Sequence, residues 1–241
     1  MCLIVFAWQV IPGMPLIAAA NRDEFYERAA APADWWPDHP EVYAGRDLQG
    51  GGTWLGITKE GRFAAITNVR GPTETRENAP SRGSLVANFL TGRLSAEDYV
   101  AELDAQADDF NGYNLLIGDC EKLIWFSNRS KDDVRNGQAL TPGVYGLSNG
   151  PLDAPWPKAV RAKAQFSSLL CQGAPEDAYF EMLTDTARAS DCRLPKTGCD
   201  LELERMLSSV CIESPGYGTR VSSVVQLYSG NTAVLHERPI K

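Results

Sequence analysis

Two apolar segments near the start of the chain constrain the fold most strongly. Residues 3–8 (LIVFAW) and 14–20 (MPLIAAA) flank Ile11-Pro12-Gly13, a sequence typical of a turn, so we predict a β-hairpin. A second hairpin is predicted over residues 219–228 and 232–237. Hairpins at both ends with helices between them favour an α+β fold whose terminal strands share one sheet.

The middle of the chain alternates short apolar segments with helical patterns. Residues 25–50 show no clear period and are predicted to form a long loop. Ser81 is predicted to be the N-cap of a helix that Gly92 ends, and Ser95 opens a capping box. Further strands are predicted near residues 50–57, 62–68, 113–118, 122–127 and 144–148, and helices over 156–170, 176–183 and 201–207. In the helix over 156–170, Val160 is expected on the apolar face. We expect one domain over residues 1–241.

Composition excludes several classes of function. The 241-residue chain carries a net charge of −8, whereas nucleic-acid binding needs a basic surface. No segment approaches the roughly 20 apolar residues of a membrane span, and no basic segment marks a signal peptide. Six cysteines without a secretory signal are expected as free thiols in a reducing compartment, which predicts a cytoplasmic protein. With two histidines and no Cys-x-x-Cys, we expect no metal site.

Cys2 suggests a specific chemistry. Removal of Met1 would give a residue that carries both a thiol and a free α-amine, a nucleophile beside its own base. The α-amine has a pKa of about 7.7–8.0, close to neutral pH. The alternative is that Cys2 is a small buried hydrophobic residue. Since His39 and His236 are the only histidines, a thiol enzyme here would use another base.

Asn21-Arg22-Asp23-Glu24 follows the strand predicted to pair with that of Cys2. Alternation places Asn21 and Asp23 on one face and Arg22 and Glu24 on the other. A carboxylate there would hold the α-amine, and a guanidinium would favour the thiolate. The alternative is a solvated strand end with a surface ion pair.

Other candidate ligand-binding residues follow predicted strands or glycines. Asn68 and Asn149 each come just after a strand, where a side-chain amide can donate to an oxyanion, although Asn149 before Gly150 also suits a turn. Arg220 begins a late strand and would bind a carboxylate or phosphate. Trp54, beside a glycine run, would line an apolar pocket.

Seven motifs in order resemble the NRDE family, which includes the transport and Golgi organisation protein 2 homologues. They are Met1-Cys2-Leu3, Asn21-Arg22-Asp23-Glu24, Gly51-Gly52-Thr53-Trp54-Leu55-Gly56, Thr67-Asn68-Val69-Arg70, Gly146-Leu147-Ser148-Asn149, Leu194-Pro195-Lys196-Thr197-Gly198 and Tyr217-Gly218-Thr219-Arg220. The resemblance implies an N-terminal-nucleophile hydrolase fold, a four-layer αββα sandwich with mainly antiparallel sheets, shared more distantly with penicillin V acylase and bile-salt hydrolase.

By that analogy, Cys2 is nucleophile and base, Asn149 with Asn68 lines the oxyanion site, and Asp23 or Glu24 holds the amine. The acylases carry an Arg and an acid three residues apart, whereas Arg22 and Asp23 are adjacent here. The first hypothesis is therefore a cysteine amidohydrolase that needs no cofactor and acts on a small-molecule amide.

The resemblance also implies a second hypothesis, a non-enzymatic carrier of haem or of a lipid or acyl-CoA ligand. Arg70 or Arg220 would take the anionic groups of the ligand. A haem iron would need His39, His236, Cys2, a Tyr or a Met as its axial ligand. A third possibility is an interaction scaffold without chemistry. The sequence leaves the ligand and the oligomeric state open.

Overall fold

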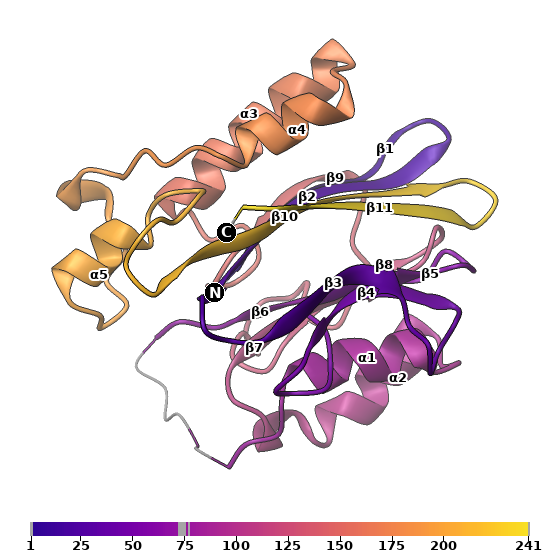
Figure 1. Ribbon diagram of the computed structural model, residues 1–241. Helices are drawn as coiled ribbons and strands as arrows, with labels where there is room; N and C mark the ends of the chain where they lie inside the picture. Colours follow the sequence, from indigo (N-terminus) through magenta and orange to yellow (C-terminus); the bar gives the residue numbers. More distant parts are fainter. Residues whose placement is uncertain (1, 72–75, 77, 241) are drawn as a thin grey trace.

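The protein folds into four layers, in which two sheets are stacked between helices (Figure 1). The computed structural model describes residues 2–71, 76 and 78–240. One sheet has five strands in the order β11 (Thr232–Pro239), β10 (Tyr217–Tyr228), β2 (Met14–Phe25), β1 (Cys2–Ile11) and β9 (Gly143–Leu147). The other has six, in the order β3 (Ala30–Trp35), β4 (Val42–Asp47), β5 (Leu55–Thr58), β6 (Phe63–Asn68), β7 (Tyr113–Gly118) and β8 (Leu123–Ser127).

Helices cover the outer face of each sheet. α1 (Gly83–Thr91) and α2 (Ala96–Asp104) pack on the six-stranded sheet. α3 (Pro157–Gln172) and α4 (Glu176–Met182) pack on the five-stranded sheet, and α5 (Leu201–Met206) lies on the same side of the molecule (Figure 1). Short 3₁₀ turns occur at Ala107–Asp109 and Asp191–Arg193. All strand pairs within the two sheets are antiparallel. With helices on the outer face of each sheet, the predicted αββα architecture with antiparallel sheets is confirmed.

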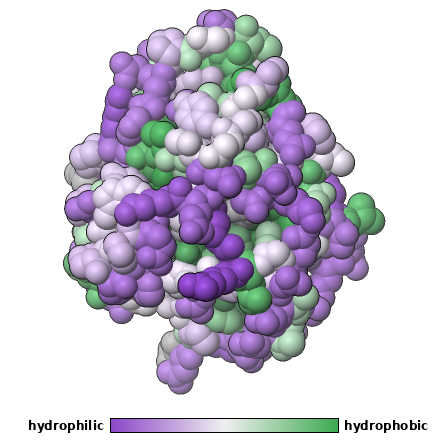
Figure 2. Space-filling model, turned by 90° about the vertical axis from the view of Figure 1, so that its right-hand side faces the viewer, coloured by the Kyte–Doolittle hydropathy of each residue, from purple (hydrophilic) through white to green (hydrophobic). Residues whose placement is uncertain are grey.

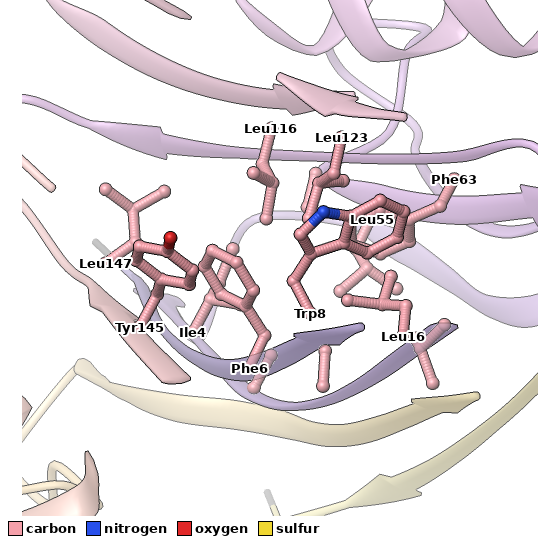
Figure 3. Packing of buried hydrophobic residues seen from close by; sticks show 14 of the residues in the cluster. Ile4, Phe6, Trp8, Leu16, Leu55, Phe63, Leu116, Leu123, Tyr145 and Leu147 are labelled. Atoms are coloured by element: carbon pink, nitrogen blue, oxygen red, sulfur yellow. The ribbon is translucent and has the colours of Figure 1, made fainter. Parts of the chain in front are cut away.

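The two-residue period of β1 divides its side chains between two cores. Ile4, Phe6 and Trp8 point between the sheets and join a cluster that includes Leu116 and Leu123 (Figure 3). The intervening residues of the strand pack instead with the helices α3 and α4. Both faces of β1 are therefore buried, which explains why its sequence is a continuous apolar run rather than an alternating pattern.

The predicted terminal hairpins are confirmed, and they share one sheet. β1 pairs with β2, β10 pairs with β11, and β2 pairs with β10. The two ends of the chain therefore meet in the middle of the five-stranded sheet, and residues at the end of β2 have neighbours from both ends of the sequence.

Three local predictions were wrong. Residues 25–50 contain β3 and β4 rather than only a loop; β3 lies at the edge of its sheet and is largely exposed, so its sequence has no clear apolar period. The N-cap of α1 is Arg82, not Ser81, and it makes no side-chain capping bond. Val160 is 48% exposed rather than part of the buried face of α3. By contrast, Ser95 caps α2 as predicted, since its Oγ accepts from the Asp98 N–H.

The face of the molecule drawn in Figure 2 is mostly hydrophilic, with hydrophobic side chains in small separate groups. Among the helices in the described part of the chain, none combines the length and apolarity needed to cross a bilayer. All six cysteines are free thiols.

Candidate functional site

A cleft of about 670 Å³ opens between the two sheets where β1 begins. From the five-stranded sheet it is lined by Cys2, by residues 22–24 at the end of β2 and by parts of β10 and β11. The six-stranded sheet contributes Asp47 and Asn68, Trp54 comes just before β5, and residues 81–83 lead from the cleft into α1. Candidate residues from distant parts of the sequence therefore share one cavity.

Cys2 is one of the residues that line this cleft and is 7% exposed. It is directly opposite Arg22 in the antiparallel ladder, so both side chains project to the same face, towards the second sheet. Burial raises the pKa of the Cys2 thiol, while the Arg22 charge and the Asp23 backbone N–H act in the opposite direction. Met1 lies outside the described residues.

Asp23 is buried and belongs to a charged group behind Cys2. Its Oδ1 accepts from Thr219 Oγ1 at 2.7 Å, and its Oδ2 lies 3.6 Å from Nζ of Lys158. Burial raises the pKa of Asp23 and lowers the pKa of Lys158, and in each case the attraction between the two charges opposes that shift. The carboxylate predicted to hold the α-amine is thus paired with a lysine that is 1% exposed.

Lys158 was missed in the sequence analysis, although the sequence contains a signal for it. Lys158, Ala162 and Phe166 are spaced four residues apart, so they lie on one stripe of α3, and all three are buried. A lysine at the beginning of an apolar stripe requires a buried partner. Its Nζ has no hydrogen bond within the described residues, and Asp23 is its ion-pair partner.

Arg22 and Glu24 face the cleft, on the side of β2 opposite to Asn21, as the alternation predicts. Arg22 Nη2 lies 3.7 Å from Asp47 Oδ2 and 4.0 Å from Glu24 Oε2. Arg28 joins the same group, with Nε 2.8 Å from Asp47 Oδ2. The ion pairs connect β2 with β4 and hold the two walls of the cleft together.

Asn68 and Asn149 are brought together by β6 and by the segment after β9. Asn68 lines the cleft, whereas Asn149 is fully buried outside its lining. Asn149 Nδ2 donates to the Asn68 carbonyl oxygen at 2.8 Å, and its Oδ1 accepts from Ser148 Oγ at 3.2 Å. The structure therefore places Asn68 next to the cavity and Asn149 directly behind it.

Asn21 does not line the cleft. Its Nδ2 donates to the carbonyl oxygens of Leu183 (2.8 Å) and Val210 (3.0 Å), and its Oδ1 accepts from Ser222 Oγ at 2.6 Å. These bonds fix the segments after α4 and α5 on the outer face of the sheet.

Arg70 is also outside the lining of the cleft. Its Nη2 lies 3.2 Å from Glu204 Oε2, and its guanidinium stacks over the ring of Trp156 at 4.4 Å. Trp54 and Arg220, by contrast, do line the cleft, and Arg220 Nη1 donates to the carbonyl oxygens of Phe25 and Arg28.

Arg82, absent from the predicted site, enters the cleft beside Cys2. Its Nη1 donates to the Gly112 carbonyl oxygen at 3.0 Å; burial lowers its pKa, and the charges of Cys2 and Glu24 oppose that shift. Gly52 makes this position possible, because it packs directly against Gly83 at the start of α1. The sequence gives little signal for Arg82, since an arginine before a helix is common at the surface.

Among the described residues, no group of three or more His, Cys, Asp or Glu side chains is arranged to hold a metal ion.

A family model and several related proteins match this chain over nearly its whole length. The family model described as "Transport and Golgi organisation 2" covers residues 1–241. The Transport and Golgi organization protein 2 homolog of Bos taurus is 36% identical over 259 residues, covering 99% of this chain and 92% of the relative. The human homolog is 34% identical with the same coverage.

A solved structure with a similar fold is the Caenorhabditis elegans ortholog of N-acylethanolamine-hydrolyzing acid amidase. It has a TM-score of 0.51 and 11% identity, and the match covers 92% of both chains. At this identity the likeness concerns the fold, which is that of the N-terminal-nucleophile hydrolases as the sequence resemblance implied. By sequence, this chain belongs to the Transport and Golgi organisation 2 family, the NRDE family of the motif at the end of β2.

Proposed function

We propose that this protein is a cysteine amidohydrolase in which Cys2, exposed by removal of Met1, attacks the carbonyl carbon of a C–N amide bond. The observation that carries the proposal is the position of Cys2, at the first residue of β1 and inside the cleft between the sheets. The likeness to an acid amidase that hydrolyses N-acylethanolamines supports the same class of reaction.

The proposed reaction has two stages. The α-amine takes the thiol proton as sulfur bonds to the carbonyl carbon, and the resulting ammonium then protonates the leaving nitrogen as the C–N bond breaks. The acyl group remains on sulfur as a thioester. Water, activated by the same amine, then attacks the thioester, releasing a carboxylic acid and restoring the thiol. The raised pKa of Cys2 suits this scheme, because the resting residue is a thiol that needs a base.

Three neighbours have distinct proposed roles. Asp23, held by Thr219 and Lys158, would orient the α-ammonium. Asn68 would donate to the oxyanion, because it is the asparagine that lines the cavity. Asn149 would act as a positioning residue through its hydrogen bond to the Asn68 carbonyl. Mutation of an oxyanion donor reduces kcat by about 10²–10³-fold.

A test combines intact-mass analysis with turnover. We expect purified protein to lack Met1, to gain one acyl group on Cys2 from a thiol-directed acylating probe, and to hydrolyse members of a panel of N-acyl amides that includes N-acylethanolamines. Cys2→Ala and a chain that retains Met1 should lose turnover, whereas Cys171→Ser, at an exposed thiol, should keep it. Undiminished hydrolysis by Cys2→Ala would contradict the proposal.

A carrier of haem or of a lipid or acyl-CoA ligand is the second candidate, supported by a lining that combines Trp54 and Ile66 with arginines. For haem, Cys2 and Tyr43 are the described lining residues with a side chain suited to axial ligation. Saturable haem or fatty-acyl binding by a processed protein that hydrolyses no amide would favour the carrier.

A further inference from the structure

The cleft has an excess of positive charge although the chain as a whole is acidic. Its described lining contains five arginines and four acidic residues, while the entire chain carries −8. The arginines are Arg22, Arg28, Arg46, Arg82 and Arg220, and the acids are Asp23, Glu24, Asp47 and Glu237. Two charges outside the lining act on this balance in opposite directions, because Lys158 offsets Asp23 and Asp38 offsets Arg46, so the excess remains. Such a cavity favours an anionic ligand.

Most of these arginines already have partners. Arg22 and Arg28 share Asp47 and Glu24. Arg46 pairs with both carboxylate oxygens of Asp38, at 2.6 and 2.8 Å. Arg220 donates to two backbone carbonyls. Their side chains are therefore engaged in holding the walls of the cleft.

Arg82 differs from these residues. Its one hydrogen bond within the described structure is to the neutral carbonyl of Gly112, and the charge of Glu24 acts on it without a described ion pair between the two. The side chain is partly buried, and desolvation lowers its pKa. A guanidinium that has lost water without gaining a carboxylate has free capacity for two parallel N–H···O bonds.

We propose that Arg82 is the anion-binding residue of the cleft, and that the substrate carries a carboxylate within a few bonds of the amide that Cys2 attacks. That the bound molecule is a substrate rests on the proposed hydrolase. That an anion binds at Arg82, in the cleft that Cys2 lines, does not. N-acyl amino acids are the class of amide that combines these two groups. Arg82 would orient the carboxylate, which would place the scissile carbonyl at the sulfur.

The charged and titratable groups that act on Cys2 come from four parts of the chain. They are Arg22 and Asp23 on β2, Lys158 on α3, Tyr217 on β10 and Arg82 before α1. Arg22 and Lys158 each have an acidic partner, so Arg82 is the cation best able to attract an incoming anion.

The first test compares two alkylating reagents of similar size, anionic iodoacetate and neutral iodoacetamide. In both reactions the sulfur bonds to carbon and iodide leaves, so their rate ratio at Cys2 reports the local charge. Peptide-resolved mass spectrometry gives the rates at Cys2 and at the exposed Cys171, an internal reference. We expect Arg82→Met to lower the iodoacetate-to-iodoacetamide ratio at Cys2 roughly tenfold without changing it at Cys171.

Two variants control this comparison. Arg82→Lys retains the charge and should keep most of the ratio. Arg46→Met removes an equal charge from the same cleft, but one already neutralised by Asp38, and should leave the ratio unchanged. An unchanged ratio in Arg82→Met, or an equal fall in Arg46→Met, would overturn the assignment.

The second test uses reversible ligands. N-hexanoylglycine should protect Cys2 from iodoacetamide, and N-hexanoylglycinamide, which differs by one charge, should not. Protection should disappear in Arg82→Met. Equal protection by both compounds, or by neither, would refute the carboxylate requirement. Neither test needs turnover. An anion site can therefore be established in a protein that hydrolyses no amide, and hydrolysis can be established in a protein that has no anion site.

Discussion

At the scale of residues, Asp23 and Lys158 place two opposite charges where water is excluded. Their side chains are 0% and 1% exposed, with Oδ2 and Nζ 3.6 Å apart. Each charge alone would be strongly disfavoured in such a site, and their attraction offsets that cost. Thr219 adds a hydrogen bond to the carboxylate. The ion pair and this hydrogen bond therefore fix the position of the Asp23 carboxylate, one residue along β2 from the partner of Cys2.

We expect Lys158→Met to reduce the free energy of unfolding by about 3–5 kcal/mol, because it leaves Asp23 buried without its cation. The double variant Lys158→Met/Asp23→Asn removes both charges and should recover most of that loss. Urea unfolding of both variants measures this. Since the Lys158 charge favours the Cys2 thiolate, the pH midpoint of Cys2 alkylation should also rise in Lys158→Met. A midpoint equal to that of the parent would argue against a link between the two sites.

At the scale of elements, the contact between β5 and α1 shapes one wall of the cleft. The segment that enters β5 passes so close to the start of α1 that a Cβ on Gly52 would lie 2.4 Å from the carbonyl group of Gly83. The Thr53 N–H also donates to the Gly83 carbonyl oxygen at 3.2 Å. Trp54, just before β5, and Arg82, the N-cap of α1, both line the cleft. Glycine at position 52 is therefore needed for packing rather than for flexibility.

Gly52→Ala should destabilise the protein by about 1–3 kcal/mol, because the added methyl group must push α1 away. It should also shift the Cys2 selectivity for iodoacetate in the direction of Arg82→Met, since Arg82 moves with the helix. Gly71→Ala is the matched control, because a Cβ there meets no atom within 4 Å. Equal stabilities of the two variants in urea unfolding would contradict this account.

At the scale of the whole molecule, Arg70 connects segments that are far apart in the sequence. Its ion pair with Glu204 joins the segment after β6 to α5, and its stacking on Trp156 adds the beginning of α3. The Arg70 N–H also donates to the Asn149 carbonyl oxygen at 2.7 Å. This buried cluster binds the ends of the layers together near the cleft without entering it.

Arg70→Met is accordingly expected to lower stability by about 3–5 kcal/mol, because Glu204 would remain buried without its cation. The iodoacetate-to-iodoacetamide ratio at Cys2 should stay close to that of the parent. Arg93→Met, at an exposed position, should change stability by no more than about 0.5 kcal/mol. Denaturant unfolding measures the two stabilities, and the alkylation assay measures the ratio at Cys2. A loss of anion selectivity in Arg70→Met would instead support a ligand-binding role for Arg70.

The sequence alone determined the two hairpins, the helices with clear spacing and an α+β domain, while the four-layer class came from the resemblance of its motifs to the NRDE family. The hairpins and helices depend on local apolar periods and turn residues. The resemblance depends on the order of the seven motifs along the chain. The sequence also placed the motif at the end of β2 beside the strand of Cys2, because a hairpin pairs its two strands, but it left open which of the alternating side chains faces Cys2. The edge strand β3 was missed because an exposed strand needs no apolar pattern.

Only the tertiary structure decided how the polar candidates divide between cavity and interior. Asn21, Arg22 and Asp23 are consecutive, yet their side chains have different surroundings. Asn21 anchors two loops, Arg22 faces the cleft and Asp23 pairs with Lys158. The role that each side chain takes depends on the element that packs against it, and that element comes from elsewhere in the chain. Arg82 and Lys158 join the site for the same reason: charge and burial are set by neighbours distant in sequence, and no local pattern encodes them.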